Sequence, residues 1–304
     1  MTRTDRPAAT PTSETWTTRR LLRWMVDFFE QKSIDAPRVV AELLLGHVLG
    51  CERMRLYMES DRPASRAELA ALRALVARAG RHEPAQYLVG SWWFYSRPFK
   101  VDPCTLIPRP CTETLVGEVI RRLREEPGHA TPLLADLGTG TGCIAVTLAL
   151  ECPTATVIAT DIVAASLDLA RTNATTHGVV DRIDFLGGSV YDAFDARPGL
   201  GDFDAICANL PYIPDHEWAD VAPNVRDHEP ATALRAGADG LDFIRPAIAD
   251  AGRWLRPGGW LALEIASSHR DAAMALARAN AALTDALIVP DHENLPRVLI
   301  ARRR

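Results

Sequence analysis

The sequence has no cysteine pair with the C-x-x-C spacing of a structural metal site, and its six cysteines are scattered along 304 residues. Even the closest two, Cys104 and Cys111, have no histidine near them in the sequence. We therefore expect neither a metal site nor a disulfide framework. Reduced thiols are the ordinary state of cysteines in a cytoplasmic protein.

Long apolar runs are also missing. No window reaches the ~18 apolar residues of a membrane-spanning helix. Residues 1–16 contain no apolar run of the kind that a signal peptide needs, and they are rich in Thr and Pro, so we expect a disordered tail there. These absences predict a cytoplasmic protein.

An excess of positive charge is absent as well, because the formal net charge is -5 and the isoelectric point is about 5.9. An acidic chain without a basic stripe has no global attraction to nucleic acid or anionic lipid. We therefore expect no membrane partner and no direct nucleic-acid binding. The closing run Arg302-Arg303-Arg304 is interpreted as a solvated tail.

What the sequence does contain is enough apolar material, 47 % of its residues, for the cores of two domains. Residues 17–84 have helical periodicity, for example from Leu21 to Phe29, and Ser65 with Glu68 forms the pattern of a helix-capping box. Residues 85–110 are aromatic and β-branched and end in prolines, which predicts a β-hairpin and a stiff linker. The first domain should therefore be small and helical.

Residues 111–304 alternate helical stretches with short apolar strands, which predicts a doubly wound α/β domain with a mainly parallel sheet. The expected strands are 133–137, 156–160, 182–186, 203–208, 260–265 and 297–302.

A glycine-rich loop follows the first of these strands in "LLADLGTGTGCIAV". Gly138, Gly140 and Gly142 permit a tight turn and a close approach of a ligand to the start of a helix. The third glycine comes one residue too early for the dinucleotide fingerprint, and Cys143 occupies the expected place. The loop fits better a ligand whose amino-acid end and ribose lie over it, such as S-adenosylmethionine.

Asp161 ends the next expected strand, at the distance expected of a carboxylate that binds two ribose hydroxyls. The alternative is a cap of the following helix. Because the acid follows a glycine loop, we favour the ribose role.

The stretch "ANLPYIP" leaves another buried strand through Asn209, Leu210, Pro211 and Tyr212. The side-chain carbonyl of Asn209 and the backbone carbonyl of Leu210 can both accept hydrogen bonds from one NH2 group. Tyr212 offers a flat face, and Pro211 fixes the backbone angle. The alternative is a strand-to-loop turn with a buried tyrosine. Ligands of doubly wound sheets bind at the carboxyl ends of the strands, so these residues should face the methyl donor.

The guest that fits these groups is a planar NH2, either an amide or the exocyclic amine of a base. Its lone pair is conjugated, and amide conjugation underlies a rotation barrier of ~18–20 kcal/mol. Two acceptors on its hydrogens and correct orientation toward the methyl group would make the nitrogen reactive. No strong base is required, because the proton can leave after the transfer.

The chain resembles the protein-glutamine methyltransferases that modify peptide-chain release factors. The resemblance covers roughly residues 20–302. It lies in "PAQYLVG", "FKVDPCTLIPRPCTETLV", "DLGTGTGCIA", "NLPYIP", "VRDHEPATALRAGADGLDFIRPAI" and "LRPGGWLALEI".

This resemblance implies a helical substrate-recognition domain over residues 17–84, a β-hairpin linker over 85–110, and a seven-stranded Rossmann-like methyltransferase domain over 111–304. It implies methyl transfer to the glutamine side chain of a Gly-Gly-Gln tripeptide in a release factor. By position, the residues that would contact S-adenosylmethionine are Gly138, Thr139, Gly140, Thr141, Gly142, Asp161, Val190 and Asn209. Asn209, Leu210, Pro211 and Tyr212 would hold the glutamine amide.

The sequence departs from the family pattern at several positions. Leu210 stands where the family usually has Pro, and Cys111 stands where it usually has Glu. Ser189 and Val190 replace an Asp and an aromatic residue that are frequent in the adenine pocket. These changes are compatible with a divergent paralogue, and they leave a substrate other than a release factor open.

Three other functions remain open. The tetrad also resembles that of ribosomal-RNA adenine dimethyltransferases, which methylate an adenine amine. The departures at Cys111 and Leu210 are compatible with a small molecule or peptide of specialised metabolism. A non-catalytic binding module is the third alternative, and the intact glycine loop argues against it.

Overall fold

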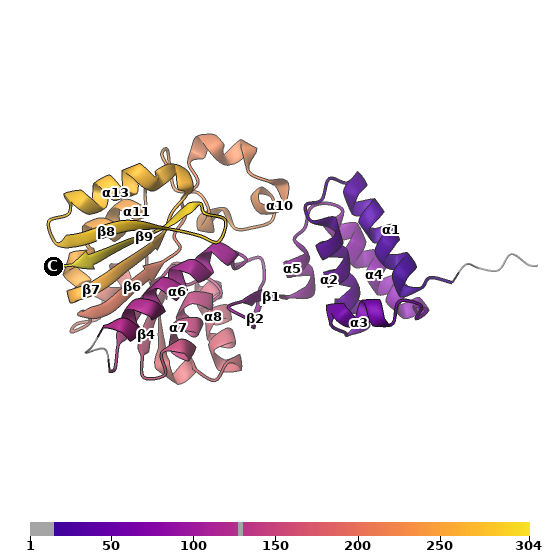
Figure 1. Ribbon diagram of the computed structural model, residues 1–304, viewed down its shortest axis with the longest axis horizontal. Coiled ribbons are helices and arrows are strands. Elements are labelled where there is room, and N and C mark those ends of the chain that lie inside the picture. The colour runs from indigo at the N-terminus through magenta and orange to yellow at the C-terminus, as the bar shows by residue number, and fades with distance from the viewer. Residues whose placement is uncertain (1–14, 127–129) are drawn as a thin grey trace, which may run out of the picture. The chain divides into compact units, whose positions relative to one another are not determined.

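The computed structural model describes residues 15–126 and 130–304. The chain divides into two compact units, Met1–Val89 and Gly90–Arg304, each with its own hydrophobic core (Figure 1). The tail predicted over residues 1–16 lies, up to residue 14, outside the described residues.

The first unit is helical, as its periodicity predicts. Thr17 caps the first helix and accepts a hydrogen bond from the Arg20 amide, at 3.4 Å. The capping box of Ser65 and Glu68 is present in full, with both reciprocal hydrogen bonds. The helices are α1 (Thr18–Gln31), α2 (Pro37–Leu49), α3 (Arg53–Met58), α4 (Arg66–Ala79) and α5 (Ala85–Val89).

The core of this unit contains the predicted apolar stripe of α1. Met25 and Phe29 are completely buried, and Leu44 of α2 and Leu72 of α4 pack in the same cluster. Burying one such side chain stabilises a fold by roughly 1.5–3 kcal/mol, so the packing of α1, α2 and α4 accounts for an independent helical unit.

The hairpin lies where the sequence predicts it, in β1 (Ser91–Phe94) and β2 (Arg97–Lys100), which pair antiparallel. The two residues of its turn, Tyr95 and Ser96, have φ values of 50° and 61°, the left-handed conformation of tight hairpin turns. Residues 85–89 differ from the expected extended structure, because they form α5. The carbonyl of Pro84 accepts hydrogen bonds from the Tyr87 and Leu88 amides, and the buried face of this turn overrides local β-propensity.

The second unit is built on a seven-stranded mixed sheet in the order β5-β4-β3-β6-β7-β9-β8. Pairing is parallel from β5 to β7 and antiparallel between β7, β9 and β8. The strands are β3 (Leu133–Leu137), β4 (Thr156–Asp161), β5 (Ile183–Gly187), β6 (Phe203–Ala208), β7 (Leu255–Glu264), β8 (Leu283–Pro290) and β9 (Pro296–Arg303). The doubly wound α/β class is confirmed. Strand β8 was not predicted from the sequence, because it is a half-exposed edge strand whose apolar pattern is interrupted by polar residues.

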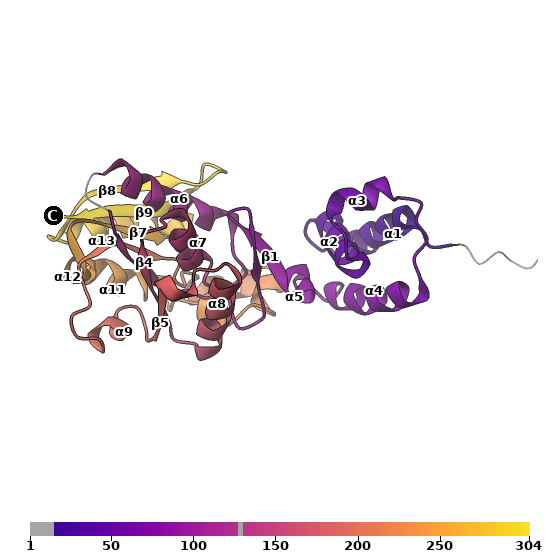
Figure 2. The ribbon, with the colours of Figure 1, turned by 90° about the horizontal axis from the view of Figure 1, so that it is seen from below.

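Helices cover both faces of this sheet (Figure 2). Successive residues of a strand point to opposite faces, so Leu134 packs with α6 and α7, whereas Ala135 packs on the side of α11 and α13. The larger helices of this unit are α6 (Pro110–Glu125), α7 (Cys143–Glu151), α8 (Ala164–Thr176), α11 (Ile244–Ala249) and α13 (Arg270–Ala279). The shorter ones are α9 (Asp192–Asp195), α10 (Pro223–Arg226) and α12 (Ala251–Trp254).

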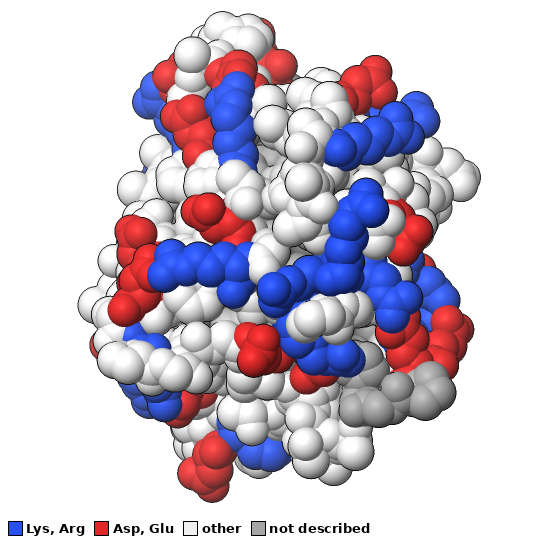
Figure 3. All heavy atoms as spheres, turned by 90° about the vertical axis from the view of Figure 1, so that its left-hand side faces the viewer, with Lys and Arg blue, Asp and Glu red and all other residues white. Residues whose placement is uncertain are grey.

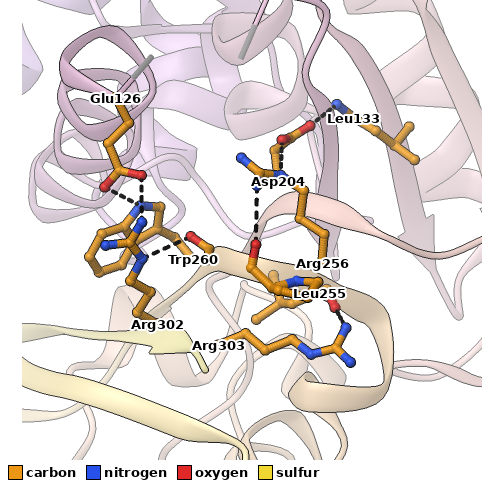
Figure 4. Close-up of polar contacts among 10 residues, drawn as sticks. Glu126, Leu133, Asp204, Leu255, Arg256, Trp260, Arg302 and Arg303 are labelled. Carbon is orange, nitrogen blue, oxygen red and sulfur yellow. Dashed lines mark hydrogen bonds and ion pairs between the residues drawn. The ribbon is translucent and has the colours of Figure 1, made fainter. Parts of the chain in front are cut away.

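The interpretation of the final arginines as a solvated tail is wrong. Arg302 and Arg303 belong to β9, inside the sheet, and Figure 4 shows their side chains bound to neighbouring elements. Arg302 donates to Glu126 at 3.0 Å and to the Gly258 carbonyl at 3.1 Å, while Arg303 donates to the carbonyl of Leu255. These arginines are held in the last strand because each donates hydrogen bonds to an acceptor on a neighbouring element.

Ion pairs also mark the surface around this strand. In the face seen in Figure 3, Lys and Arg side chains lie among Asp and Glu side chains. Arg256 pairs with Asp204 at 2.5 Å, and Asp204 also accepts from the Leu133 amide at 2.6 Å (Figure 4). Within the described ranges, no helix is long and apolar enough to cross a membrane, and no group of three or more His, Cys, Asp or Glu residues is placed to hold a metal ion.

Candidate active site

A pocket with about 900 Å³ of empty space, including the part open to solvent, lies in the second unit at the carboxyl ends of β3, β4 and β6. This is the edge of a doubly wound sheet where ligands bind. The lining residues are Cys104, Thr105, Leu106, Pro108, Thr112, Gly138, Thr139, Gly140, Thr141, Cys143, Ile144, Asp161, Ile162, Val163, Ser166, Gly188, Ser189, Val190, Asn209, Leu210, Pro211, Thr232, Ala233 and Phe243.

The glycine loop after β3 forms one wall of this pocket. Gly138, Gly140 and Gly142 have φ values of 68°, 53° and 79°, which are left-handed and strained for any other residue. Gly138 and Gly140 line the pocket, whereas Gly142 faces α8, where an added Cβ would lie 3.0 Å from Ala170. Two of these glycines thus keep backbone available to a ligand, and the third permits close helix packing.

Asp136, on β3, holds the glycine loop through hydrogen bonds. It was not predicted from the sequence. Its carboxylate is fully buried and accepts hydrogen bonds from the Thr139 hydroxyl at 2.6 Å and the Ala145 amide at 3.1 Å. Burial raises the pKa of Asp136 to about 7, although both hydrogen bonds favour the ionised form. A lone acid in the apolar strand "LLADL" was the available signal.

Asp161 ends β4 at the edge of the pocket. Its two carboxylate oxygens accept hydrogen bonds from the Gly140 and Val163 amides, both at 2.9 Å. Burial raises the pKa of Asp161, and these amides oppose the rise. Each oxygen keeps a further lone pair, so the carboxylate can accept two more hydrogen bonds from a ligand. The alternative interpretation, in which Asp161 is the N-cap of the following helix, does not hold, because the N-cap of α8 is Val163, and Asp161 accepts from the amide of that residue.

The tetrad after β6 divides between the pocket and the interior. Asn209, Leu210 and Pro211 line the pocket, whereas Tyr212 is not among the lining residues. The Tyr212 amide donates to the Leu234 carbonyl at 3.2 Å, and burial raises the pKa of the Tyr212 phenol. The Leu210 side chain is 6 % exposed and packs toward Gly138, where an added Cβ would lie 3.1 Å from Leu210 Cδ2.

Asn209 is held by Thr112, a residue of α6. Its Nδ2 donates to the Thr112 hydroxyl at 3.1 Å, and that hydroxyl donates to Glu264 Oε2 at 2.6 Å. Cys111 donates weakly to the other oxygen of Glu264, at 3.5 Å. Thr112 and Glu264 were not predicted, and an acid at the end of the apolar stretch "WLALEI" was the only sequence signal for this contact.

A second buried acid joins the linker to the loop that follows the tetrad. Glu229, from the "EPATAL" block, accepts from the Ile107 amide at 3.1 Å and pairs with Arg109 at 2.5 Å. Glu229 is 5 % exposed, so both partners satisfy a carboxylate that has almost no water around it. The linker is therefore fixed against the pocket by the same block that carried the resemblance.

Apolar side chains close the remaining wall. Val190 lines the pocket with a φ of 44°, an unusual conformation for a β-branched residue. Ile162, 58 % exposed, and Phe243 also line it, and neither was predicted. Such a wall suits one flat face of an aromatic ligand.

Comparison with known families gives two matches along the chain. Residues 20–90 match the family model described as the PrmC N-terminal domain, and residues 134–228 match the model described as a methyltransferase domain. These matches fall on the helical unit and on the unit that contains the pocket.

Curated relatives cover nearly the whole chain. The release factor glutamine methyltransferase of Chlorobaculum tepidum is 40 % identical over 292 residues, which is 95 % of this chain and 98 % of the relative. That of Geobacter sulfurreducens is 41 % identical over 254 residues, covering 83 % of this chain and 85 % of the relative.

A solved structure shares the fold. The catalytic domain of hMettl16, solved in complex with the MAT2A 3'UTR hairpin 6, superposes with a TM-score of 0.51 at 14 % identity. It covers 80 % of this chain and 84 % of that chain, and at this identity the likeness concerns the Rossmann-like fold alone. With the two relatives, it confirms the resemblance and the fold class: the chain is an S-adenosylmethionine-dependent methyltransferase and belongs to the release factor glutamine methyltransferase family.

Proposed function

We propose that this methyltransferase modifies the side-chain amide nitrogen of a protein glutamine, the glutamine of the Gly-Gly-Gln tripeptide in a peptide-chain release factor. One observation carries the proposal. The NH2 group of Asn209 donates a hydrogen bond to Thr112. The carbonyl oxygen Oδ1 of Asn209 is therefore the atom available to accept from a guest NH2 in the pocket. The names of the curated relatives support the same substrate.

The pocket fits the methyl donor. Its lining combines apolar side chains with a few polar groups, as is usual for small-molecule sites. We assign the ribose hydroxyls to the free lone pairs of Asp161 and the adenine face to the wall that includes Val190. A Cβ added at Gly140 would meet no atom closer than 3.9 Å, so the loop backbone is open toward the donor. Thr139, Thr141 and Asn209 complete the proposed contacts.

The chain's own groups bring the amide into position. S-adenosylmethionine supplies a methyl group on a sulfonium sulfur. Asn209 Oδ1 and the Leu210 carbonyl accept the two hydrogens of the glutamine NH2, which orients its lone pair toward the methyl group and weakens its conjugation. The nitrogen gains one methyl group and afterwards loses one proton to solvent, so no side chain acts as a strong base.

The remaining residues of the tetrad have supporting roles in this proposal. Pro211 limits the backbone freedom after the accepting carbonyl. Tyr212, partly buried next to the residues that line the pocket, gives the amide a flat surface at its edge. The helical unit is proposed to bind the body of the release factor, and its match to the family's N-terminal domain supports this role.

A labelled-methyl transfer assay tests the proposal. Purified release factor, the same factor with the tripeptide glutamine changed to alanine, and ribosomal RNA are incubated in parallel with labelled S-adenosylmethionine. We expect label only in the unmodified release factor. Equal labelling of the alanine variant, or label in RNA alone, would overturn the glutamine assignment.

A further inference from the structure

A chain of hydrogen bonds runs from the pocket into the interior of the second unit. It begins at Asn209, after β6, continues through Thr112 on α6 and ends at Glu264, the last residue of β7. The distances are 3.1 Å and 2.6 Å. Thr112 is 2 % exposed and Glu264 is 1 % exposed, so protein groups replace water as their partners.

The chemistry of the middle group sets the direction of this chain. A threonine hydroxyl has a single hydrogen, and an ionised carboxylate can only accept. Thr112 must therefore give its hydrogen to Glu264 and accept the second hydrogen bond from Asn209. Only the NH2 side of the Asn209 amide can donate, which fixes the choice between two amide orientations that differ by a half-turn.

The surroundings of Glu264 come from several elements. The Cys111 thiol on α6 approaches one oxygen at 3.5 Å, and the charges of Arg297 on β9 and Arg109 on the linker favour the ionised form. Tyr212 is near enough for the Glu264 charge to oppose ionisation of its phenol. Burial has the largest influence and raises the pKa of Glu264, so its ionised form depends on Thr112, Cys111 and these two arginines.

We propose that Thr112 and Glu264 are positioning residues that hold the Asn209 amide with Oδ1 turned to the substrate. This inference rests on the proposed function, because it gives Asn209 Oδ1 the glutamine NH2 as its partner. In the described part of the structure no protein group donates to Asn209 Oδ1, which leaves that atom for the substrate. With the amide reversed, its NH2 would face the substrate NH2 and no hydrogen bond would form.

Two substitutions at one position separate hydroxyl chemistry from packing. Thr112→Val keeps the shape and removes the hydroxyl, and should lower kcat roughly 10- to 100-fold on the release factor. Thr112→Ser keeps the hydroxyl and should restore kcat to within about threefold of the parent. Thr147→Val is the matched control, because Thr147 is also buried but its hydroxyl has no hydrogen-bond partner among the described residues. Donor affinity, measured by calorimetry, should stay the same in Thr147→Val, whose side chain is not among the residues that line the pocket.

The pH profile gives a readout that a packing role would not change. When Glu264 gains a proton it can donate to Thr112, and the direction of the chain is no longer fixed. The kcat of the parent enzyme should therefore fall as pH is lowered through the raised pKa of Glu264. Glu264→Gln should have a lower kcat that lacks this acidic limb. An acidic limb that is identical in the Gln variant would overturn the role of Glu264.

A measurement without turnover keeps the inference separate from the substrate assignment. The side-chain NH2 resonances of Asn209, assigned by their loss in Asn209→Ala, should shift in Thr112→Val and remain near the parent position in Thr112→Ser. Resonances that are unchanged in Thr112→Val would refute the positioning role, even if no release factor is methylated. If Asn209→Ala abolishes methylation but Thr112→Val has full kcat, the proposed function stands and this inference fails.

Discussion

On the glycine-loop side of the pocket, side chains hold backbone that is close in the sequence, whereas on the linker side they join distant segments. Asp136 binds residues three and nine positions along the chain. By contrast, Asn209 and Thr112 are 97 residues apart, Thr112 and Glu264 are 152 apart, and Ile107 and Glu229 are 122 apart. The donor side is thus a local motif, while the acceptor side exists only once the whole unit has folded.

This difference divides the chemistry as well as the architecture. In the proposed function the local side binds a donor common to many methyltransferases, and the long-range side selects the acceptor. Substitutions on the two sides should therefore affect different quantities, donor affinity on one and turnover on the other.

The largest effect is expected for Asn209→Ala, on the acceptor side. Removing the carbonyl that accepts the glutamine NH2 should lower kcat by roughly 10²–10³-fold, as for loss of one preorganised hydrogen-bonding group. Circular dichroism should show a retained fold, because Asn209 is half-exposed at the pocket. A methylation rate equal to that of the parent would remove Asn209 from the mechanism.

Asp161→Ala should act on the donor side. Loss of the proposed ribose hydrogen bonds should weaken binding of S-adenosylmethionine by roughly 10- to 100-fold in calorimetry, since hydrogen bonds to charged groups contribute ~1.5–3 kcal/mol. Asp168→Ala is the control, because that carboxylate on α8 is 79 % exposed and pairs only with Arg171 among the residues of the structure. If the two variants bind the donor equally well, Asp161 only holds the backbone of Gly140 and Val163.

Glu229→Ala should remove the contacts that hold the linker against the pocket. The Ile107 amide and Arg109 would lose their buried partner, which should lower the free energy of unfolding by roughly 1–3 kcal/mol, moderated by the partial exposure of Arg109. The measurement is urea denaturation, with the exposed Glu217→Ala as control. Equal midpoints for both variants would mean that the linker is held in another way.

Asp136 should make stability depend on pH in an unusual direction. Its pKa is raised from 3.8 to about 7, so the folded state binds a proton more strongly than the unfolded state. Its contribution to stability is therefore full below pH 4 and is lost as pH rises toward 7. Asp136→Asn should gain stability relative to the parent between pH 4 and pH 7 in denaturant titrations. Parallel profiles would show that Asp136 stays ionised.

The smallest effect is expected for Leu210→Pro. The substitution keeps the backbone carbonyl that accepts the glutamine NH2, so kcat should remain within about threefold of the parent. A loss of activity in the release-factor assay would show that Leu210, which packs toward Gly138, is adapted to a different substrate.

Much of the architecture could be predicted because its signals are local. Periodicity and local residue patterns located the helical unit, the capping box and the hairpin. Strand-end residues placed Gly138, Asp161 and Asn209 around one pocket and the family resemblance added Val190, and all four line the pocket. Edge strand β8 was missed, since its pattern is weak. The prediction of a solvated tail was wrong, because Arg302 donates a hydrogen bond to Glu126, which lies 176 residues away in the sequence.

The same limit explains the site residues that were missed. Thr112, Glu229 and Glu264 lie in blocks that carry the family resemblance, but no local pattern indicates what they bind, because their partners are 97 to 152 residues away. Asp136 was closer to prediction, because a buried acid between apolar residues requires partners. Gly142 and Tyr212 show the opposite problem, since they belong to the motifs but lie outside the pocket lining.

The most direct test is to place the methyl group by fragmentation mass spectrometry of a release factor treated with this enzyme. We expect one added methyl on the side-chain nitrogen of the Gly-Gly-Gln glutamine, strongly reduced when Asn209→Ala is used. A methyl group on any other residue, or none on the release factor, would contradict it.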